Sequence, residues 1–426
     1  MGFSSMDQLI TKITTDGQKW RTDWNKVTTQ VQTSGAGRWF ELFTASGNPV
    51  AGYWGNYVLN SGFDSAANWT GLGAGGWAWN SAGTIVHTAG TAGNVTQTSA
   101  TTIETNTTYT VIITSSSIGG SGGFQVDIGG VSGTAITTNT TTIQAITTGG
   151  STTQTISIIP NSACTVTLDN FYIIAGGTNG QSPRFKPMSS TTDQGALWPG
   201  TVVGGSMTSH LLNMSAMTAG GTTVPTTLLL VDLLGVYARI DANYASAVTF
   251  GNTLTLPRYT TGAGVRAFAC VYPTTLGANA HNFIISYTNQ GGAANSRAFP
   301  QTVAGTVSAL PTHISHSGTA ANNVGPFLPL QTGDTGIQSI QTWQQSAAGG
   351  TASTFQNVVL CKPIMAIPIT TQYILAERDL LNQFPSLPLV QEASASSGAC
   401  LAWLQYAGAA TPVSTAFYGA LEFAWN

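Results

Sequence analysis

The chain has 426 residues, only 7% of them are charged, and the formal net charge is −3. Because about 25% of the residues of an ordinary soluble protein are charged, neutral hydroxyl and amide groups must cover much of this surface. The Lys and Arg residues are scattered, which argues against the basic surface that a nucleic-acid partner requires. The hydrophobic fraction of 42% is enough for sizeable cores, and the length predicts two or three domains.

Sequence features bearing on compartment point to a protein made in the cytosol. No apolar run approaches the roughly 18–20 residues of a membrane-spanning helix, and the opening residues lack the apolar core of a secretory signal. The four cysteines are far apart in apolar contexts, so buried free thiols are expected in preference to disulfides or a metal site. A weakly charged surface is poorly protected against association, and we therefore expect the chain to work while packed into an assembly.

Residues 1–55 are predicted to form an N-terminal anchor segment, with a short helix followed by an aromatic-rich extended arm. Met6, Leu9, Ile10 and Ile13 recur at helical spacing behind a serine N-cap. The aromatic residues that follow are too dense to bury one another, so they are expected to dock onto the next domain or another subunit. The candidate anchoring residues are Trp20, Trp24, Trp39, Phe40 and Phe43.

Residues 56–178 carry the pattern of short, half-buried antiparallel strands. Apolar residues alternate with Thr and Ser around Tyr109, Phe124 and Val166, and glycine pairs separate the runs. The opening NSGFDSAANWTG, the Tyr-x-Val-x-Ile strand at Tyr109 and the closing LDNF at Leu168 resemble a carbohydrate-binding-module jelly roll, the galactose-binding-like sandwich. The resemblance implies a sandwich fold and, more weakly, a glycan ligand.

Two tryptophans of this region are the candidate glycan-binding residues. Trp77 and Trp79 are two apart on a predicted strand and therefore point to the same side. They fit a platform on which a sugar ring stacks, and they equally fit core positions facing the opposite sheet.

Residues 179–200 read as a linker, and residues 201–426 as a C-terminal β domain. The near-continuous apolar run 226–238 fits a segment buried on both sides, and alternation around Val265, Phe283 and Val358 predicts further strands. Residues 373–384 show an apolar and a charged side, which predicts a short helix near the C-terminus. The expected fold class is mainly β, with two β-sandwich or jelly-roll domains.

Three further segments and the opening region resemble bacteriophage virion structural proteins. In the opening region the similar runs are TDWNKVTTQ and AGRWFELFTASGNPVAG. The three further segments are VDLLGVYARIDA, TLPRYTTGAGVRAF and the SYTNQGG turn. The resemblance implies a capsid-associated decoration, head-fibre or minor capsid protein, assembled in the bacterial cytoplasm. The alternative is a tail-fibre or baseplate protein. The implied partners are other virion proteins, further copies of the chain (a trimer is favoured) and, in the alternative function, a host-surface glycan.

Catalytic chemistry finds little support in the sequence. His313 and His316 form an HxxH pair that supplies only two metal ligands and needs others brought by folding or symmetry. The carboxylates at Asp64, Glu104, Asp127 and Asp169 each stand alone, whereas glycoside hydrolysis needs a pair. We predict a protein that is not an enzyme and has no cofactor; a glycan-binding receptor and a polysaccharide depolymerase are the competing hypotheses.

Overall fold

The computed structural model confirms a mainly β protein. It describes residues 3–26, 38–43, 56–100, 102–175, 185–188, 208–219, 224–241, 244–251, 255–272, 281–294, 296–297, 301–303, 314–315, 325–346, 355–391, 398–408 and 415–426. In these ranges there is one α-helix, α1 (Met6–Thr14), and one 3₁₀ turn, η1 (Leu381–Gln383); the remaining elements are strands. No helix in these ranges is long and apolar enough to cross a membrane.

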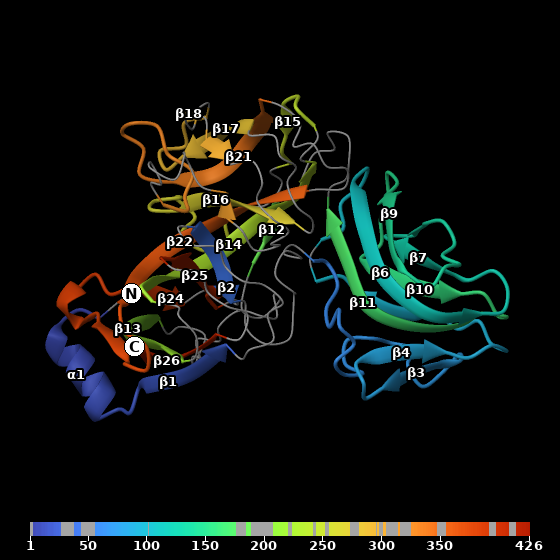
Figure 1. The fold of residues 1–426 in the computed structure, drawn as a ribbon, viewed down its shortest axis with the longest axis horizontal. Coiled ribbons are helices and arrows are strands. Elements are labelled where there is room, and N and C mark those ends of the chain that lie inside the picture. The colour runs from blue at the N-terminus through green and yellow to red at the C-terminus, as the bar shows by residue number, and fades with distance from the viewer. Residues whose placement is uncertain are drawn as a thin grey trace.

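Residues 56–175 form a sandwich of two antiparallel sheets (Figure 1, blue to green). One sheet has the order β3 (Trp77–Asn80), β4 (Thr84–His87), β11 (Thr165–Ala175), β6 (Thr108–Gly119) and β9 (Thr141–Thr147). The other has the order β5 (Val95–Thr98), β10 (Thr155–Pro160), β7 (Phe124–Ile128) and β8 (Val131–Ser132). Alternating residues such as Val111, Val126 and Leu168 point between the sheets and are fully buried, as the period-two pattern predicts.

Three further sheets make up the rest of the molecule. The terminal sheet has the order β1 (Lys19–Lys26), β26 (Ala416–Trp425), β13 (Ser209–Ala219) and β23 (Ala376–Asp379), and β24 (Leu389–Gln391) also pairs with β13. The central sheet has the order β2 (Arg38–Phe43), β25 (Leu401–Ala407), β14 (Thr226–Asp241), β22 (Phe355–Ile369), β16 (Arg266–Tyr272) and β20 (Ile314–Ser315), and β12 (Phe185–Pro187) pairs with β14. The third sheet contains β15 (Val248–Thr249), β21 (Ile337–Gln345), β17 (His281–Asn289), β18 (Ser296–Arg297) and β19 (Gln301–Val303).

The central sheet is shared by two packing layers because β14 and β22 are long. The first part of β14 and the end of β22 pack against the terminal sheet through Leu228, Leu230 and Ile367. The second part of β14 packs against the third sheet through Leu234 and Tyr237. The apolar run 226–238 therefore forms a strand that is buried on both faces, as its composition predicts.

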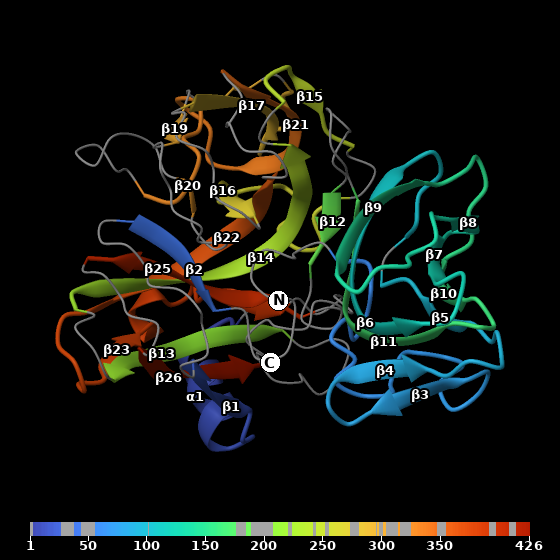
Figure 2. The same ribbon diagram turned by 45° about the vertical axis from the view of Figure 1, so that its right-hand side comes forward.

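The opposite face of the central sheet meets the sandwich. Ile112, Tyr172 and Ile174, on the outer side of the β6–β11 pair, pack with central-sheet residues that include Val231 and Phe268. Figures 1 and 2 both show the sandwich lying beside the central sheet, with β11 and β6 turned towards it.

A buried ion pair interrupts the apolar surface of β14. Arg258 donates to both carboxylate oxygens of Asp232, from Nε at 2.8 Å and from Nη2 at 2.6 Å, and the backbone N–H of Cys400 donates to Oδ1 at 2.9 Å. Arg258 also donates to the backbone oxygens of Met188 and Leu233. Burial opposes the charge on Arg258, but the Asp232 carboxylate outweighs it and raises the pKa of the guanidinium. The charge that breaks the apolar run is thus paired and hydrogen-bonded, as a buried charge must be.

Within the predicted anchor segment, the helix is confirmed and the arm is integrated into the fold. Ser5 caps α1 by accepting a hydrogen bond from the Gln8 backbone. β1 pairs along its length with β26, from Lys19 opposite Ala424 to Lys26 opposite Phe417, and β2 pairs with β25. The described parts of residues 1–55 therefore add edge strands to two sheets of the C-terminal region.

The predicted helix over residues 373–384 is wrong. Residues 376–379 form β23, which pairs with β13 from Ala216 to Asn213, and only η1 follows. The free edge of β13 offers backbone hydrogen bonds that outweigh the local preference for a helix. The linker prediction at 179–200 falls largely outside the described residues, although Phe185 in β12 is buried against β14.

Candidate functional site

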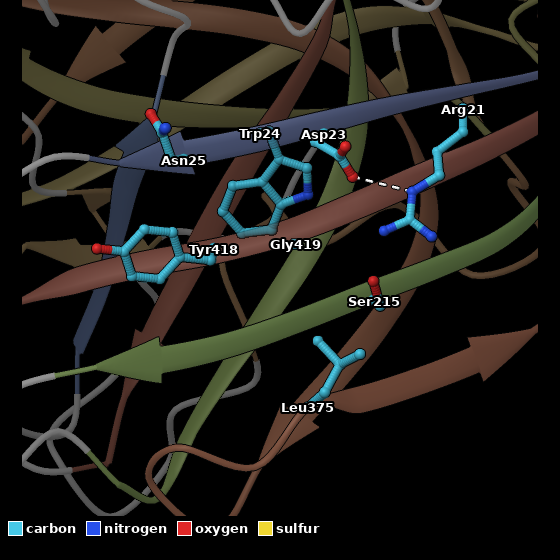
Figure 3. A pocket seen from close by; sticks show the side chains of 8 residues that line it. All are labelled: Arg21, Asp23, Trp24, Asn25, Ser215, Leu375, Tyr418 and Gly419. Atoms are coloured by element: carbon cyan, nitrogen blue, oxygen red, sulfur yellow. Dashed lines mark hydrogen bonds and ion pairs between the residues drawn. The ribbon is translucent and has the colours of Figure 1, made fainter.

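An open depression lies on the outer face of the terminal sheet (Figure 3). Small residues form its floor, because Gly419 and Ala420 of β26 stand opposite Ala216 and Ser215 of β13. Larger side chains rise around this floor from β1, from β26 and from the segment before β23. The cavity has a volume of about 320 Å³ and is lined by Arg21, Asp23, Trp24, Asn25, Ser215, Leu375, Tyr418 and Gly419.

Gly419 is required at the floor by close packing. A Cβ at this position would lie 2.0 Å from the backbone oxygen of Ser215 and 2.6 Å from Cζ2 of Trp24. The Trp24 indole therefore lies against the glycine, and its other neighbour is the Trp403 ring, 5.2 Å away between centroids. The floor is held by two packed indoles of the core, so its geometry is rigid.

The apolar wall consists of Tyr418 and Leu375. Tyr418 stands opposite Asn25 in the β1–β26 register, and both Tyr418 and Leu375 are among the exposed large hydrophobic residues. Figure 3 shows Tyr418 on the Asn25 side of the cavity and Leu375 on the Ser215 side. An exposed aromatic ring beside a small-residue floor provides a flat surface on which a ring-shaped ligand can stack.

Paired charges form the polar wall. Arg21 Nε donates to Asp23 Oδ1 at 2.9 Å, and Arg21 Nη1 lies 3.7 Å from Glu422 Oε1. Lys19 Nζ lies 2.8 Å from Glu422 Oε2. The hydrogen bond to Asp23 raises the pKa of Arg21, so the guanidinium stays charged and its charge is balanced locally. The wall offers hydrogen-bond donors and acceptors without a strong net field.

The predicted anchoring residues separate into different environments. Trp24 is buried, Trp39 packs on Tyr406 with a centroid distance of 5.4 Å, and Trp20 is 48% exposed. Phe40 and Phe43 lie in the edge strand β2. The structure thus places Trp24 in the core and leaves the Trp20 ring half exposed.

The two candidate glycan-binding tryptophans also differ. Trp77 is 2% exposed, donates from Nε1 to the Gly93 oxygen and packs on His87, so it is a core residue and offers no ring face to a sugar. Trp79 is exposed and donates from Nε1 to the Phe63 oxygen. The prediction of a two-ring platform is therefore wrong, because the Trp77 ring is buried in the core and only Trp79 is exposed.

Exposed large hydrophobic residues gather at the terminal sheet and the segments that flank it. Among the residues whose exposure the structure describes there are eleven, and only Trp79, Ile143 and Ile284 lie elsewhere. The other eight are Met6, Ile10, Trp20, Tyr373, Ile374, Leu375, Leu381 and Tyr418. The amphipathic pattern of residues 373–384 predicts Ile374 and Leu375 on the apolar side of a helix, but the structure leaves both side chains exposed.

The remaining candidates for chemistry are the HxxH pair and the isolated carboxylates. His313 and His316 lie outside the described residues, and no group of three or more His, Cys, Asp or Glu side chains comes together in those ranges. Burial raises the pKa of Asp169, and the nearby Asp64 charge raises it further. The sequence shows these carboxylates only as isolated residues, and it gives no sign of the depression, because Arg21, Ser215 and Tyr418 come from three distant segments.

Comparisons with known proteins add no family assignment. No protein-family model matches the chain, and no curated protein matches it. Among solved structures, the chain is similar at 12% identity to the infectious bursal disease virus VP2 subviral particle, covering 95% of this chain and 80% of that chain with a TM-score of 0.11. A structure of the Gt strain of the same virus gives 12% identity, coverage of 96% and 80%, and a TM-score of 0.10. Likenesses this weak carry no argument about fold or function.

Proposed function

We propose that the chain is a non-enzymatic structural component of a bacteriophage particle, associated with the capsid as a decoration, head-fibre or minor capsid protein. The observation that supports this most directly is the gathering of exposed hydrophobic side chains at the terminal sheet. Such a grouping is typical of a surface that another protein covers.

The segment before β23 is the most exposed part of this grouping. Tyr373, Ile374 and Leu375 are consecutive, and they are 67%, 60% and 52% exposed. Their place is held by the backbone, because the Tyr373 N–H donates to the Thr218 oxygen at 3.0 Å. Three neighbouring apolar side chains on a fixed backbone cost solubility in a free protein and contribute affinity once a partner buries them.

The low charge of the chain is consistent with the same conclusion. With 29 charged residues in 426 (13 basic and 16 acidic), little electrostatic repulsion opposes association with copies or neighbours. A particle component meets this condition, since its partners are present at high local concentration throughout assembly.

A co-sedimentation experiment tests the proposal. Particles from a phage preparation that carries the chain are dissociated and reassembled with purified protein, either wild type or Ile374→Ser/Leu375→Ser. We expect the wild type to enter the particle fraction of a density gradient and the double variant to remain at the top. Ile284→Ser, which alters an exposed apolar residue of the third sheet, is the matched control and should enter particles normally. Wild-type protein that never joins the particle fraction would overturn the proposal.

A further inference from the structure

We propose that the depression on the outer face of the terminal sheet is a binding site for a neutral saccharide, with a pyranose ring stacked on Tyr418. The inference does not rest on the proposed function, because its test uses the purified chain alone. It places glycan recognition in the C-terminal region, away from the sandwich to which the sequence pattern assigned it.

The dimensions of the site suit one or two sugar rings. A volume of about 320 Å³ is at the lower end of the roughly 300–1,000 Å³ typical of small-molecule sites. The floor of Gly419, Ala420 and Ser215 lets a ring approach the sheet closely, because no side chain longer than a hydroxymethyl stands there. Tyr418 rises beside this floor with its ring partly exposed, as stacking on the apolar face of a pyranose requires.

Polar groups surround the stacking surface in the arrangement that sugar hydroxyls need. Arg21 Nε donates a hydrogen bond to Asp23 Oδ1, and Oδ2 of the same carboxylate can accept a hydrogen bond from a sugar hydroxyl. Ser215 Oγ accepts from the Ala420 N–H at 3.1 Å, which leaves its own proton to donate. Asn25 lies beside Tyr418 in the register and offers both a donor and an acceptor.

The charge balance favours a neutral ligand. Arg21 is satisfied by Asp23 and lies near Glu422, and Glu422 is paired with Lys19. An anionic ligand would meet the Asp23 and Glu422 carboxylates, and a cationic ligand would meet Arg21 and Lys19, whereas a hydroxyl group can bond to a paired charge without adding a charge of its own.

The site is also preorganised. The Trp24 and Trp403 indoles support the floor from below, and Tyr418, Asp23 and Asn25 stand on paired strands. A site built on strands loses little conformational freedom when it binds, which favours the weak, specific binding typical of a single sugar subsite.

Saturation-transfer difference NMR tests the proposal. The purified full chain is mixed with glucose, galactose, mannose and N-acetylglucosamine, and separately with N-acetylneuraminic acid as a charged probe. We expect transfer to the ring protons of at least one neutral sugar, and weaker or no transfer to the charged probe. Failure of every neutral sugar, or a clear preference for the charged one, overturns the proposal.

Variants locate the site. Tyr418→Ala removes the stacking surface and should raise the dissociation constant about tenfold. Tyr418→Phe keeps the ring and should bind like the wild type, whereas Asp23→Ala should raise the dissociation constant. Trp79→Ala, in the sandwich, is the matched aromatic control and should bind like the wild type. Binding that survives Tyr418→Ala, or that is lost with Trp79→Ala while circular dichroism shows an intact fold, refutes the assignment.

Discussion

At the residue scale, the Asp232–Arg258 pair makes the strongest prediction about stability. Both side chains are almost completely buried, and removal of one partner leaves the other charge in the core. Asp232→Ala should therefore lower the free energy of unfolding in urea by about 3–5 kcal/mol. Asp16→Ala breaks the half-exposed pair with Lys12 and should cost less than about 1 kcal/mol. Equal losses in the two variants would contradict the account.

Burial of His210 predicts that the stability of the protein depends on pH. The residue is buried, its Nδ1 lies 3.3 Å from the Leu387 oxygen, and burial lowers the pKa of the imidazole from its usual value of about 6.5. Below that pH the unfolded chain takes up a proton that the folded chain resists. Stability should therefore fall as the pH drops from about 6.5 towards the lower folded pKa, and no effect from this group is expected above it.

Denaturant titrations at several pH values measure this dependence. His210→Gln removes the titrating group, so its unfolding free energy should change less between pH 7 and pH 5 than that of the wild type. An unchanged pH slope in the variant would show that other groups cause the dependence.

At the element scale, two tryptophans of β1 test whether this strand is an integral part of the fold or a detachable arm. Trp24 packs on Trp403 and against Gly419, whereas Trp20 on the same strand is half exposed. Trp24→Ala should destabilise the protein by about 3–5 kcal/mol, and Trp20→Ala should change stability by less than about 1 kcal/mol. Thermal unfolding followed by circular dichroism compares the two, and a small effect from Trp24→Ala would restore the interpretation as a free arm.

Elements with a strict local pattern were predictable, and elements that depend on distant partners were not. The alternation at Phe124, Val126 and Ile128 identifies β7 because each apolar side chain meets the same core. The segment 373–384 has an amphipathic helical pattern, but its conformation is decided by Met214 and Ser215 across the sheet. Likewise, the candidate site joins Asp23, Ser215 and Tyr418 through strand registers that a single sequence does not contain.

At the scale of the whole molecule, the sandwich has a core of its own and one apolar outer face. Its core cluster contains only residues between 57 and 175, while Ile112, Tyr172 and Ile174 pack on the central sheet. Residues 56–175 expressed alone should therefore fold and self-associate through this uncovered face. Sedimentation velocity should show oligomers that Ile112→Ser/Ile174→Ser returns to monomers. An unfolded fragment by near-ultraviolet circular dichroism would show that the sandwich depends on the central sheet.

The scarcity of charge and the exposed apolar residues of the terminal sheet both fit the proposed role, in which neighbouring proteins cover this surface. In the proposed function, assembly into a particle would supply that cover, and the proposed saccharide site on the same sheet would lie at the rim of the covered surface. The depression and the apolar segment before β23 share Leu375, so partner contact and ligand binding are expected to influence each other.

Immunogold electron microscopy of purified phage particles, with antibodies raised against this chain, tests the central claim most directly. The account predicts gold at a regular position on intact particles, concentrated on the capsid, and none on particles assembled without the protein. Gold that is absent from every intact particle, with all of the antigen recovered as free protein, would contradict it.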